Sequence, residues 1–238
     1  MPMFDLPEIP RHPSMTTQEY VYARLRNAIM VGVVQPESTL TIRGLADYLD
    51  LSPTPVREAL RRLSSERAIE LLGNRRISIP VMTAARFDEI VRLRMTLECH
   101  AARRALPFVS EVLIDQMRLI DDRMDDYVQS RDMNALTISN HEFHQVLYTA
   151  NPHQTVMPVI ESVWLQLGPF QRQMIRELEQ FYLIDRHKEI LAALRQRDGA
   201  ALTEAIEADI EDGIGRVGHE VLRARQPGLQ PLNGQLGM

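Results

Sequence analysis

Arginine and hydroxyl side chains are concentrated in one short stretch of the chain, from Ser52 to Leu63. Within it, apolar residues recur at the i, i+3, i+4 and i+7 spacing of one helix face: Val56, Ala59, Leu60 and Leu63. The side chains that could bind phosphate or base edges point elsewhere: Thr54, Arg57, Arg61 and Arg62. Such a helix suits insertion into the major groove of DNA. Taken alone, the stretch is equally well interpreted as a solvated basic helix face.

The start of this helix has its own local signals. Ser52 stands where an N-cap residue would accept a hydrogen bond from the first amides. Proline in the first turn costs the helix no hydrogen bond. Upstream, Thr41 predicts the N-cap of a short helix from Ile42 to Leu49, and three residues then connect the two helices. Two short helices joined in this way are typical of a helix-turn-helix motif, and a further helix is expected from Thr17 to Val31.

A β-hairpin is expected after the second of these short helices. Two extended runs, Ile69 to Leu72 and Ile77 to Ile79, flank a turn that begins Gly73-Asn74. A hairpin at this place predicts a wing, with Arg75 and Arg76 at its tip, where they would contact phosphate or the minor groove. Three helices and a wing favour DNA binding over the interpretation as a solvated surface helix.

Charge is distributed unevenly along the 238 residues. The net charge is −5, yet residues 41–80 hold seven arginines and five acidic residues, while residues 81–238 hold 17 basic and 23 acidic residues. A mildly basic module joined to an acidic one is compatible with DNA binding by the first. The chain has no apolar run near the ~20 residues that span a bilayer, no signal-peptide pattern and a single cysteine, Cys99. We therefore expect a cytoplasmic protein without internal disulfides.

Residues 17–80 resemble the winged helix-turn-helix of the GntR family of bacterial transcription regulators. The resemblance rests on Leu45-Ala46 and on the run Ser52-x-Thr54-Pro55-Val56-Arg57-Glu58-Ala59-Leu60-Arg61-Arg62-Leu63. By position, it implies that Arg43, Thr54 and Arg57 touch DNA. The sequence departs from the family pattern at Pro53, where arginine is usual, and at Ala68 and Arg76, where glycines are usual. The missing arginine removes one expected DNA contact.

The chain beyond the linker from Pro80 to Thr83 is expected to be entirely helical. Its apolar spacing and caps predict helices over residues 84–106, 110–130, 132–148, 155–176, 183–197 and 200–222. The predicted fold class is mainly α, with a winged helix-turn-helix followed by an antiparallel bundle of six or seven helices. The expected organisation is a flexible arm (1–13), a DNA-binding domain (14–80), an effector-binding and dimerisation domain (84–222) and a disordered tail (226–238).

Residues 84–222 resemble the C-terminal ligand-binding domain of the FadR subfamily, known as the FCD type. The markers are Arg94-x3-Glu98, Phe143-His144, Asn151-Pro152, and His187 followed by Ile190 and Ala193. Many such domains hold a divalent metal on one aspartate and three histidines. The resemblance places this set at Asn140, His144, His187 and Asp209.

Two of these four positions differ from the family pattern, since Asn140 replaces an aspartate and Asp209 a histidine. Asn140 and His144 are four residues apart and share a helix face. Two imidazoles, a carboxylate and an amide oxygen suit zinc, nickel, manganese or iron. A weakened or metal-free pocket is the alternative.

Arg94 is the candidate for binding the carboxylate of an effector, because a guanidinium group binds carboxylate through two hydrogen bonds. Glu98 is assigned to the same effector site. The alternative for this pair is a salt bridge at i, i+4 spacing. Trp164, the only tryptophan, is predicted to be a core residue rather than a stacking platform for a ligand.

The main functional hypothesis is a homodimeric transcription regulator, a repressor and not an enzyme. Its winged helix would bind a palindromic operator, with two recognition helices about one DNA turn apart. A small metabolite, an organic acid, would bind the C-terminal domain and shift the arrangement of the two DNA-binding parts. Two alternatives stay open: a metal-dependent enzyme that uses the histidine and aspartate cluster, and a winged-helix protein-interaction module, which Pro53 and Arg76 motivate.

Overall fold

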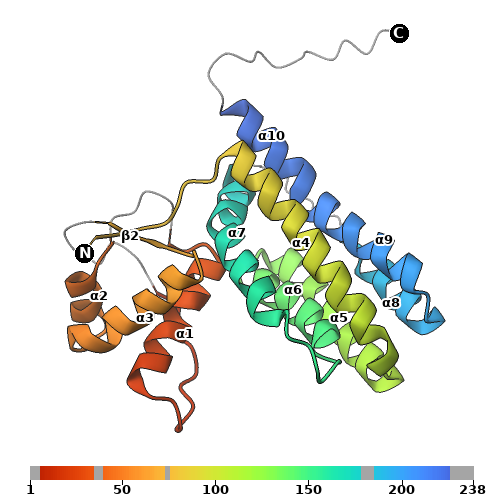
Figure 1. Ribbon diagram of the computed structural model, residues 1–238, viewed down its shortest axis with the longest axis horizontal. Coiled ribbons are helices and arrows are strands. Elements are labelled where there is room, and N and C mark those ends of the chain that lie inside the picture. Colours follow the sequence, from red (N-terminus) through yellow and green to blue (C-terminus); the bar gives the residue numbers. More distant parts are fainter. Residues whose placement is uncertain (1–5, 35–39, 73–75, 178–184, 226–238) are drawn as a thin grey trace.

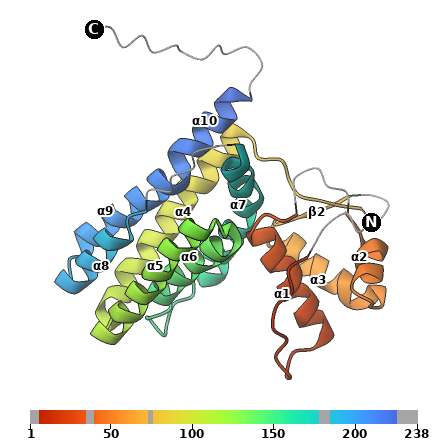
Figure 2. The ribbon, with the colours of Figure 1, turned by 180° about the vertical axis from the view of Figure 1, so that it is seen from behind.

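The computed structural model describes residues 6–34, 40–72, 76–177 and 185–225, and these form two hydrophobic cores. Figures 1 and 2 show the corresponding parts side by side, and we call them the winged helix (residues 17–79) and the helical bundle (residues 84–225). The predicted mainly helical fold class is confirmed. No described helix combines the length and the apolar character that are needed to cross a membrane.

The winged helix contains three helices and a small antiparallel sheet in the order β1-β3-β2. Its elements are α1 (Thr17–Met30), β1 (Leu40–Thr41), α2 (Ile42–Tyr48), α3 (Pro53–Ser65), β2 (Glu70–Leu72) and β3 (Arg76–Ser78). The side chain of Thr16 and that of Glu19 form a reciprocal capping box that starts α1. The predicted apolar face of α3 is buried against α1. Leu40 and Ile77 of the sheet are buried in the same core as these helices. Arg75, which the sequence predicts at the tip of the wing, lies outside the described residues.

The segment before α1 differs from the prediction of a flexible arm. Leu6 is buried in the core of the winged helix. Its amide donates to the hydroxyl of Tyr48, and its carbonyl accepts a 2.9 Å hydrogen bond from Arg24. The apolar side chain at position 6 and these two hydrogen bonds hold the segment against the domain. At Leu6 the chain is therefore held against the domain, in contrast to the expectation of a flexible arm at this position.

The helical bundle is built from long helices that follow one another through short connections. Its elements are α4 (Ala84–Ala105), η2 (Leu106–Phe108), α5 (Glu111–Ser130), α6 (Met133–Tyr148), α7 (Met157–Glu177), α8 (His187–Gln196), α9 (Gly199–Ile210), η3 (Glu211–Gly215) and α10 (Arg216–Ala224). Side chains of Ser110, Asp132 and Asp198 cap α5, α6 and α9. The predicted tail, residues 226–238, lies outside the described residues.

One predicted helix of the bundle is interrupted. The sequence predicted a continuous helix over residues 200–222, but a π-helical turn, η3, separates α9 from α10. Two glycines within the turn weaken the α-helical preference. Asp212 in the turn also accepts a 2.6 Å hydrogen bond from Nη2 of Arg186, which draws the backbone toward the start of α8. Wide turns of this kind occur often beside functional sites, and this one borders the pocket described next.

Candidate metal and effector pocket and DNA-binding surface

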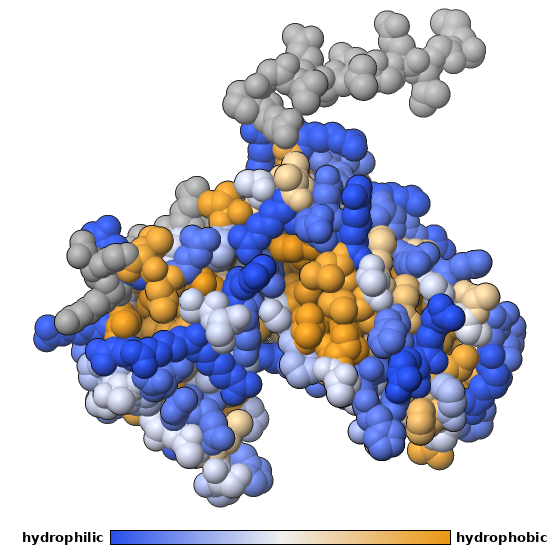
Figure 3. Space-filling view, in the orientation of Figure 1, coloured by the Kyte–Doolittle hydropathy of each residue, from blue (hydrophilic) through white to orange (hydrophobic). Residues whose placement is uncertain are grey.

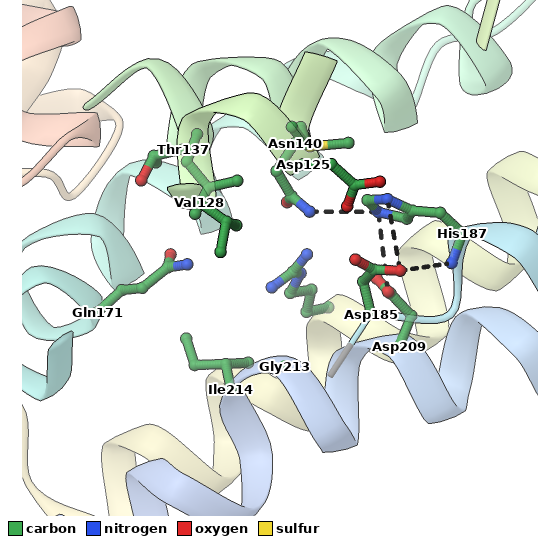
Figure 4. A pocket seen from close by; sticks show the side chains of 13 residues that line it. Asp125, Val128, Thr137, Asn140, Gln171, Asp185, His187, Asp209, Gly213 and Ile214 are labelled. Carbon is green, nitrogen blue, oxygen red and sulfur yellow. Dashed lines mark hydrogen bonds and ion pairs between the residues drawn. The ribbon is translucent and has the colours of Figure 1, made fainter. Parts of the chain in front are cut away.

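A cavity of about 60 Å³ lies inside the helical bundle, lined by α4, α5, α6, α7, α8, α9 and η3. Figure 4 shows side chains from several helices pointing into it. The polar groups that line it come from segments far apart in the sequence: Arg94, Asp125, Thr137, Asn140, Gln171, Asp185, His187 and Asp209. The cavity can hold a metal ion with a few bound waters or an acid of a few carbon atoms.

Three of the four predicted metal-binding side chains converge closely. The Nε2 atom of His144 lies 3.1 Å from Oδ2 of Asp209, and the Nε2 atom of His187 lies 3.8 Å from Oδ1 of the same carboxylate. Asn140 is adjacent, with its amide nitrogen 3.3 Å from Nε2 of His187 (Figure 4). A 180° turn of that amide would present its oxygen instead. The residues that the sequence predicts as one metal-binding set therefore lie close together in the structure.

The other ring nitrogen of each histidine has a partner of its own. The Nδ1 atom of His187 lies 2.9 Å from Oδ1 of Asp121, and the Nδ1 atom of His144 lies 3.2 Å from the hydroxyl of Tyr148. Partners at Nδ1 fix the tautomer and leave Nε2 to bind a metal. Neither Asp121 nor Tyr148 was among the site residues predicted from the sequence. The sequence feature that could have indicated Asp121 is its position on the apolar face of α5, beside Ile120 and Met124.

The chemistry of this set fits a divalent cation. The Nε2 atom of His144 is buried and, among the described residues, has no assigned hydrogen-bond partner, although Oδ2 of Asp209 lies 3.1 Å from it. Burial raises the pKa of Asp209, but the His144 and His187 imidazoles outweigh it and hold that pKa well below its usual range. Burial lowers the pKa of His187, but Asp121 and Asp209 outweigh it, so the pKa is raised. An ionised carboxylate facing two Nε2 atoms is a donor set that zinc, nickel, manganese or iron accepts.

Arg94 lines the same cavity, and Glu98 lies beneath it. The Nε atom of Arg94 donates a 2.6 Å hydrogen bond to Oε1 of Glu98. Glu98 is fully buried and also accepts from Nε1 of Trp164 and from the hydroxyl of Tyr148, each at 2.8 Å. Glu98 does not line the cavity, so its predicted contact with the effector is replaced by a role in positioning Arg94. The two Nη atoms of Arg94 make no hydrogen bond to a described residue and remain available for a ligand.

The predicted DNA-binding residues lie on the surface of the winged helix. Side chains exposed to solvent are Arg43, Ser52, Thr54, Arg57, Arg61, Arg62 and Arg76. Ser52 occupies the N-cap position of α3, but its hydroxyl makes no capping hydrogen bond. Arg62 is engaged within the protein: its guanidinium lies 3.8 Å from the centre of the Tyr22 ring, and its Nε donates to Glu66. Arg62 therefore lies on the side of α3 that faces α1, unlike Arg57.

A winged helix joined to a helical bundle with an internal ligand pocket defines the class of ligand-responsive DNA-binding regulators. Residues 17–79 match the family of bacterial regulatory proteins named gntR, and residues 89–212 match the FCD domain. The chain belongs to the GntR family of transcription regulators and carries an FCD effector-binding domain. This confirms the resemblance found in the sequence.

Named relatives are transcription regulators as well. The chain is 28% identical over 195 residues to the HTH-type transcriptional regulator McbR of Escherichia coli K12, which covers 79% of this chain and 86% of that protein. It is 24% identical over 198 residues to the gluconate operon transcriptional repressor of Bacillus subtilis, covering 79% of each. The solved structure of E. coli McbR/YncC shares the fold, with a TM-score of 0.76 at 22% identity, over 87% of this chain and 99% of that one.

Proposed function

We propose that this regulator is a repressor whose affinity for a palindromic operator is controlled by a small carboxylate bound, with a divalent metal, in the pocket of the helical bundle. One observation carries the proposal: Arg94, with two Nη atoms available, lines the same small cavity as His187 and Asp209. A guanidinium and a metal ion held side by side can bind the two ends of one small acid.

The metal ligands in this proposal are His144, His187 and Asp209, with Asn140 as a fourth. When bound, the metal would supply a Lewis-acidic centre for a carboxylate or hydroxyl oxygen of the effector. Arg94 would pair with a carboxylate, and the amide of Gln171 would hydrogen-bond a further polar group. The cavity, about 60 Å³, suits a short organic acid. Because the family consists of transcription regulators, we assign the site to binding and not to turnover.

The DNA contacts in this proposal come from three elements. Thr54, Arg57 and Arg61 on α3 would enter the major groove, where arginine recognises guanine through two hydrogen bonds. Arg43 at the start of α2 would bind the phosphate backbone, and the wing arginines Arg75 and Arg76 would reach phosphate or the minor groove. The support is that the described members of this set are exposed and that α3 follows α2 as in a helix-turn-helix.

We also propose that two copies pair through an apolar surface of the helical bundle. Figure 3 shows hydrophobic side chains gathered over α4 and its border with α7. Leu93 on α4 is 43% exposed and Val159 on α7 is 48% exposed. A contiguous apolar patch on a soluble protein favours contact with another chain. A two-fold dimer, in which the same patch serves both copies, matches the symmetry of a palindromic operator.

The direct experiment is footprinting of the purified protein on the DNA that flanks its own gene. We expect protection of an inverted repeat, with affinity that falls steeply as salt rises because arginines displace counterions from phosphate. Zn²⁺, Ni²⁺ or Mn²⁺ should change that affinity in the wild type and leave it unchanged in His144→Ala. Binding that shows no sequence preference at any inverted repeat would contradict the operator proposal, and an equal metal response in both proteins would contradict the metal proposal.

A further inference from the structure

Helix α7 contributes side chains to both hydrophobic cores. Leu165 is buried in the core of the winged helix, and its helix packs against α1. Val163, Leu167 and Phe170, from other faces of the same helix, are buried in the core of the helical bundle. Figures 1 and 2 both place α7 against α1 on one side and within the bundle on the other. One helix is therefore a structural part of both domains.

The face of α7 that meets the winged helix is continuous over three turns. Glu161 forms an ion pair of 3.3 Å with Arg26 of α1. The hydroxyl of Ser162 donates a 2.7 Å hydrogen bond to the backbone carbonyl of Glu66, the residue that ends α3. Leu165 lies one turn further along. Through Ser162, the bundle holds the C-terminal end of the helix that carries Thr54 and Arg57.

Two glycines set how closely α7 approaches α1. A Cβ atom at Gly168 would collide with the backbone carbonyl oxygen of Met30 and would lie 2.7 Å from that of Ile29. Gly32, just after α1, has φ +67°, and a Cβ there would collide with Cβ of Arg172. Because the obstructing atoms at Gly168 belong to the α1 backbone, neither helix can yield by turning a side chain. This contact admits no side chain at either glycine.

The side of the same turns that adjoins this face borders the pocket. Gln171 follows Gly168 by three residues, and its amide points into the cavity (Figure 4). Trp164 donates to Glu98, the residue that positions Arg94. A group that binds Arg94 or Gln171 therefore acts on α7 within one turn of its contact with Ile29 and Met30.

We propose that α7 is the element that positions the winged helix on the bundle, and that its glycine contact with α1 transmits the state of the pocket to α3. The transmission of a ligand signal rests on the function proposed above, whereas the positioning role does not. Coupling of this kind requires only that ligand binding favours one placement of α7 over another.

The test is hydrogen exchange by mass spectrometry on the full chain, first without added metal. Gly168→Ala should speed exchange in α1 and α3 by at least tenfold and leave α4 and α6 within twofold of wild type. Alanine is the better helix former, so without the contact this substitution would stabilise the protein. Gly199→Ala is the matched control, because its Cβ would meet only Cδ2 of Leu106 at an ordinary 3.6 Å. Exchange in α1 and α3 that matches the control overturns the positioning role.

Two further substitutions keep the test decisive if Gly168→Ala fails to fold. Leu165→Ala and Leu167→Ala remove the same atoms from opposite sides of α7. We expect the first to speed exchange mainly in α1 and α3, and the second mainly in α4 and α6. The same pattern for both variants overturns the proposal.

The transmission role is tested by adding Zn²⁺ alone as the probe. In the wild type, Zn²⁺ should slow exchange in the bundle and also in α1 and α3, whereas in Gly168→Ala it should slow exchange only in the bundle. Slowing confined to the bundle of the wild type overturns transmission. Failure of the proposed function is distinct: Zn²⁺ would then slow exchange nowhere, while the metal-free result for Gly168→Ala would stand.

Discussion

The imidazole of His187 is held at Nδ1 by Asp121, at 2.9 Å, while its Nε2 atom faces Asp209. This pair connects α5 to the candidate metal set, although Asp121 itself does not line the cavity. A carboxylate behind a histidine ligand orients the ring and raises its basicity.

Asp121→Asn should weaken metal binding roughly 10- to 100-fold, the usual effect of losing a partner behind a histidine ligand. The amide keeps the size of the side chain but removes the negative charge that supports His187. Titration calorimetry with Zn²⁺ measures the effect. Asp122→Asn is the control, since Asp122 is an exposed neighbour paired with Arg118. Equal affinities for the two variants would show that Asp121 has no part in the site.

Glu98→Ala should lower the free energy of unfolding by about 3–5 kcal/mol, because it leaves the buried charge of Arg94 without its partner. It also removes the acceptor of Trp164 and Tyr148. Urea unfolding followed by circular dichroism measures the change. Glu58→Ala removes a partner of Arg61 at an exposed pair and should cost about 0–1 kcal/mol. If Glu98→Ala lowers the free energy of unfolding no more than the control does, Glu98 does not stabilise the buried guanidinium of Arg94.

Arg57→Ala should weaken operator binding by about 1–3 kcal/mol, which is roughly 5- to 150-fold, and relax the preference for one base position. Arg62→Ala should change base preference little, because that arginine stacks on Tyr22 and pairs with Glu66. Fluorescence anisotropy with the footprinted operator and single-base variants separates the two effects. If Arg62→Ala loses base preference as fully as Arg57→Ala, the surface of α3 that reads DNA is wider than proposed.

Leu93→Glu should convert the proposed dimer to a monomer, because it places a charge within the apolar patch on α4 and α7. Val112→Glu is the matched control: Val112 is 78% exposed on α5 and lies outside that patch. Sedimentation velocity measures the oligomeric state of each. If the dimer persists in Leu93→Glu but dissociates in Val112→Glu, the dimer interface lies on α5 instead.

Much of the winged helix could be predicted because each element carries its own local signal. The spacing of Val56, Ala59, Leu60 and Leu63 defined the buried face of α3, and the Gly-Asn turn defined the hairpin. The burial of Leu6 could not be predicted from a proline-rich start. It depends on Tyr48 and Arg24, which folding brings to it from distant positions.

The site was predictable only in part, for a related reason. Family-like spacing indicated His144, His187 and Asp209, and they do converge. Asp121 and Tyr148 were missed because their role is defined by contacts across helices and not by spacing along one helix. The dual role of α7 was equally hidden, since Leu165 and Leu167 are both apolar residues in one amphipathic helix.

The burial of Leu165 in the winged helix also affects whether the two domains of this chain can be separated or exchanged. A fragment cut at the linker near Pro80 would lack one of its own core side chains and would expose the apolar site that Leu165 fills. A chimaera that joins residues 1–80 to another effector domain would need a matching leucine and a matching glycine on the helix that replaces α7. Exchange of the two domains of this chain therefore requires matching residues well beyond the boundary between its two family matches.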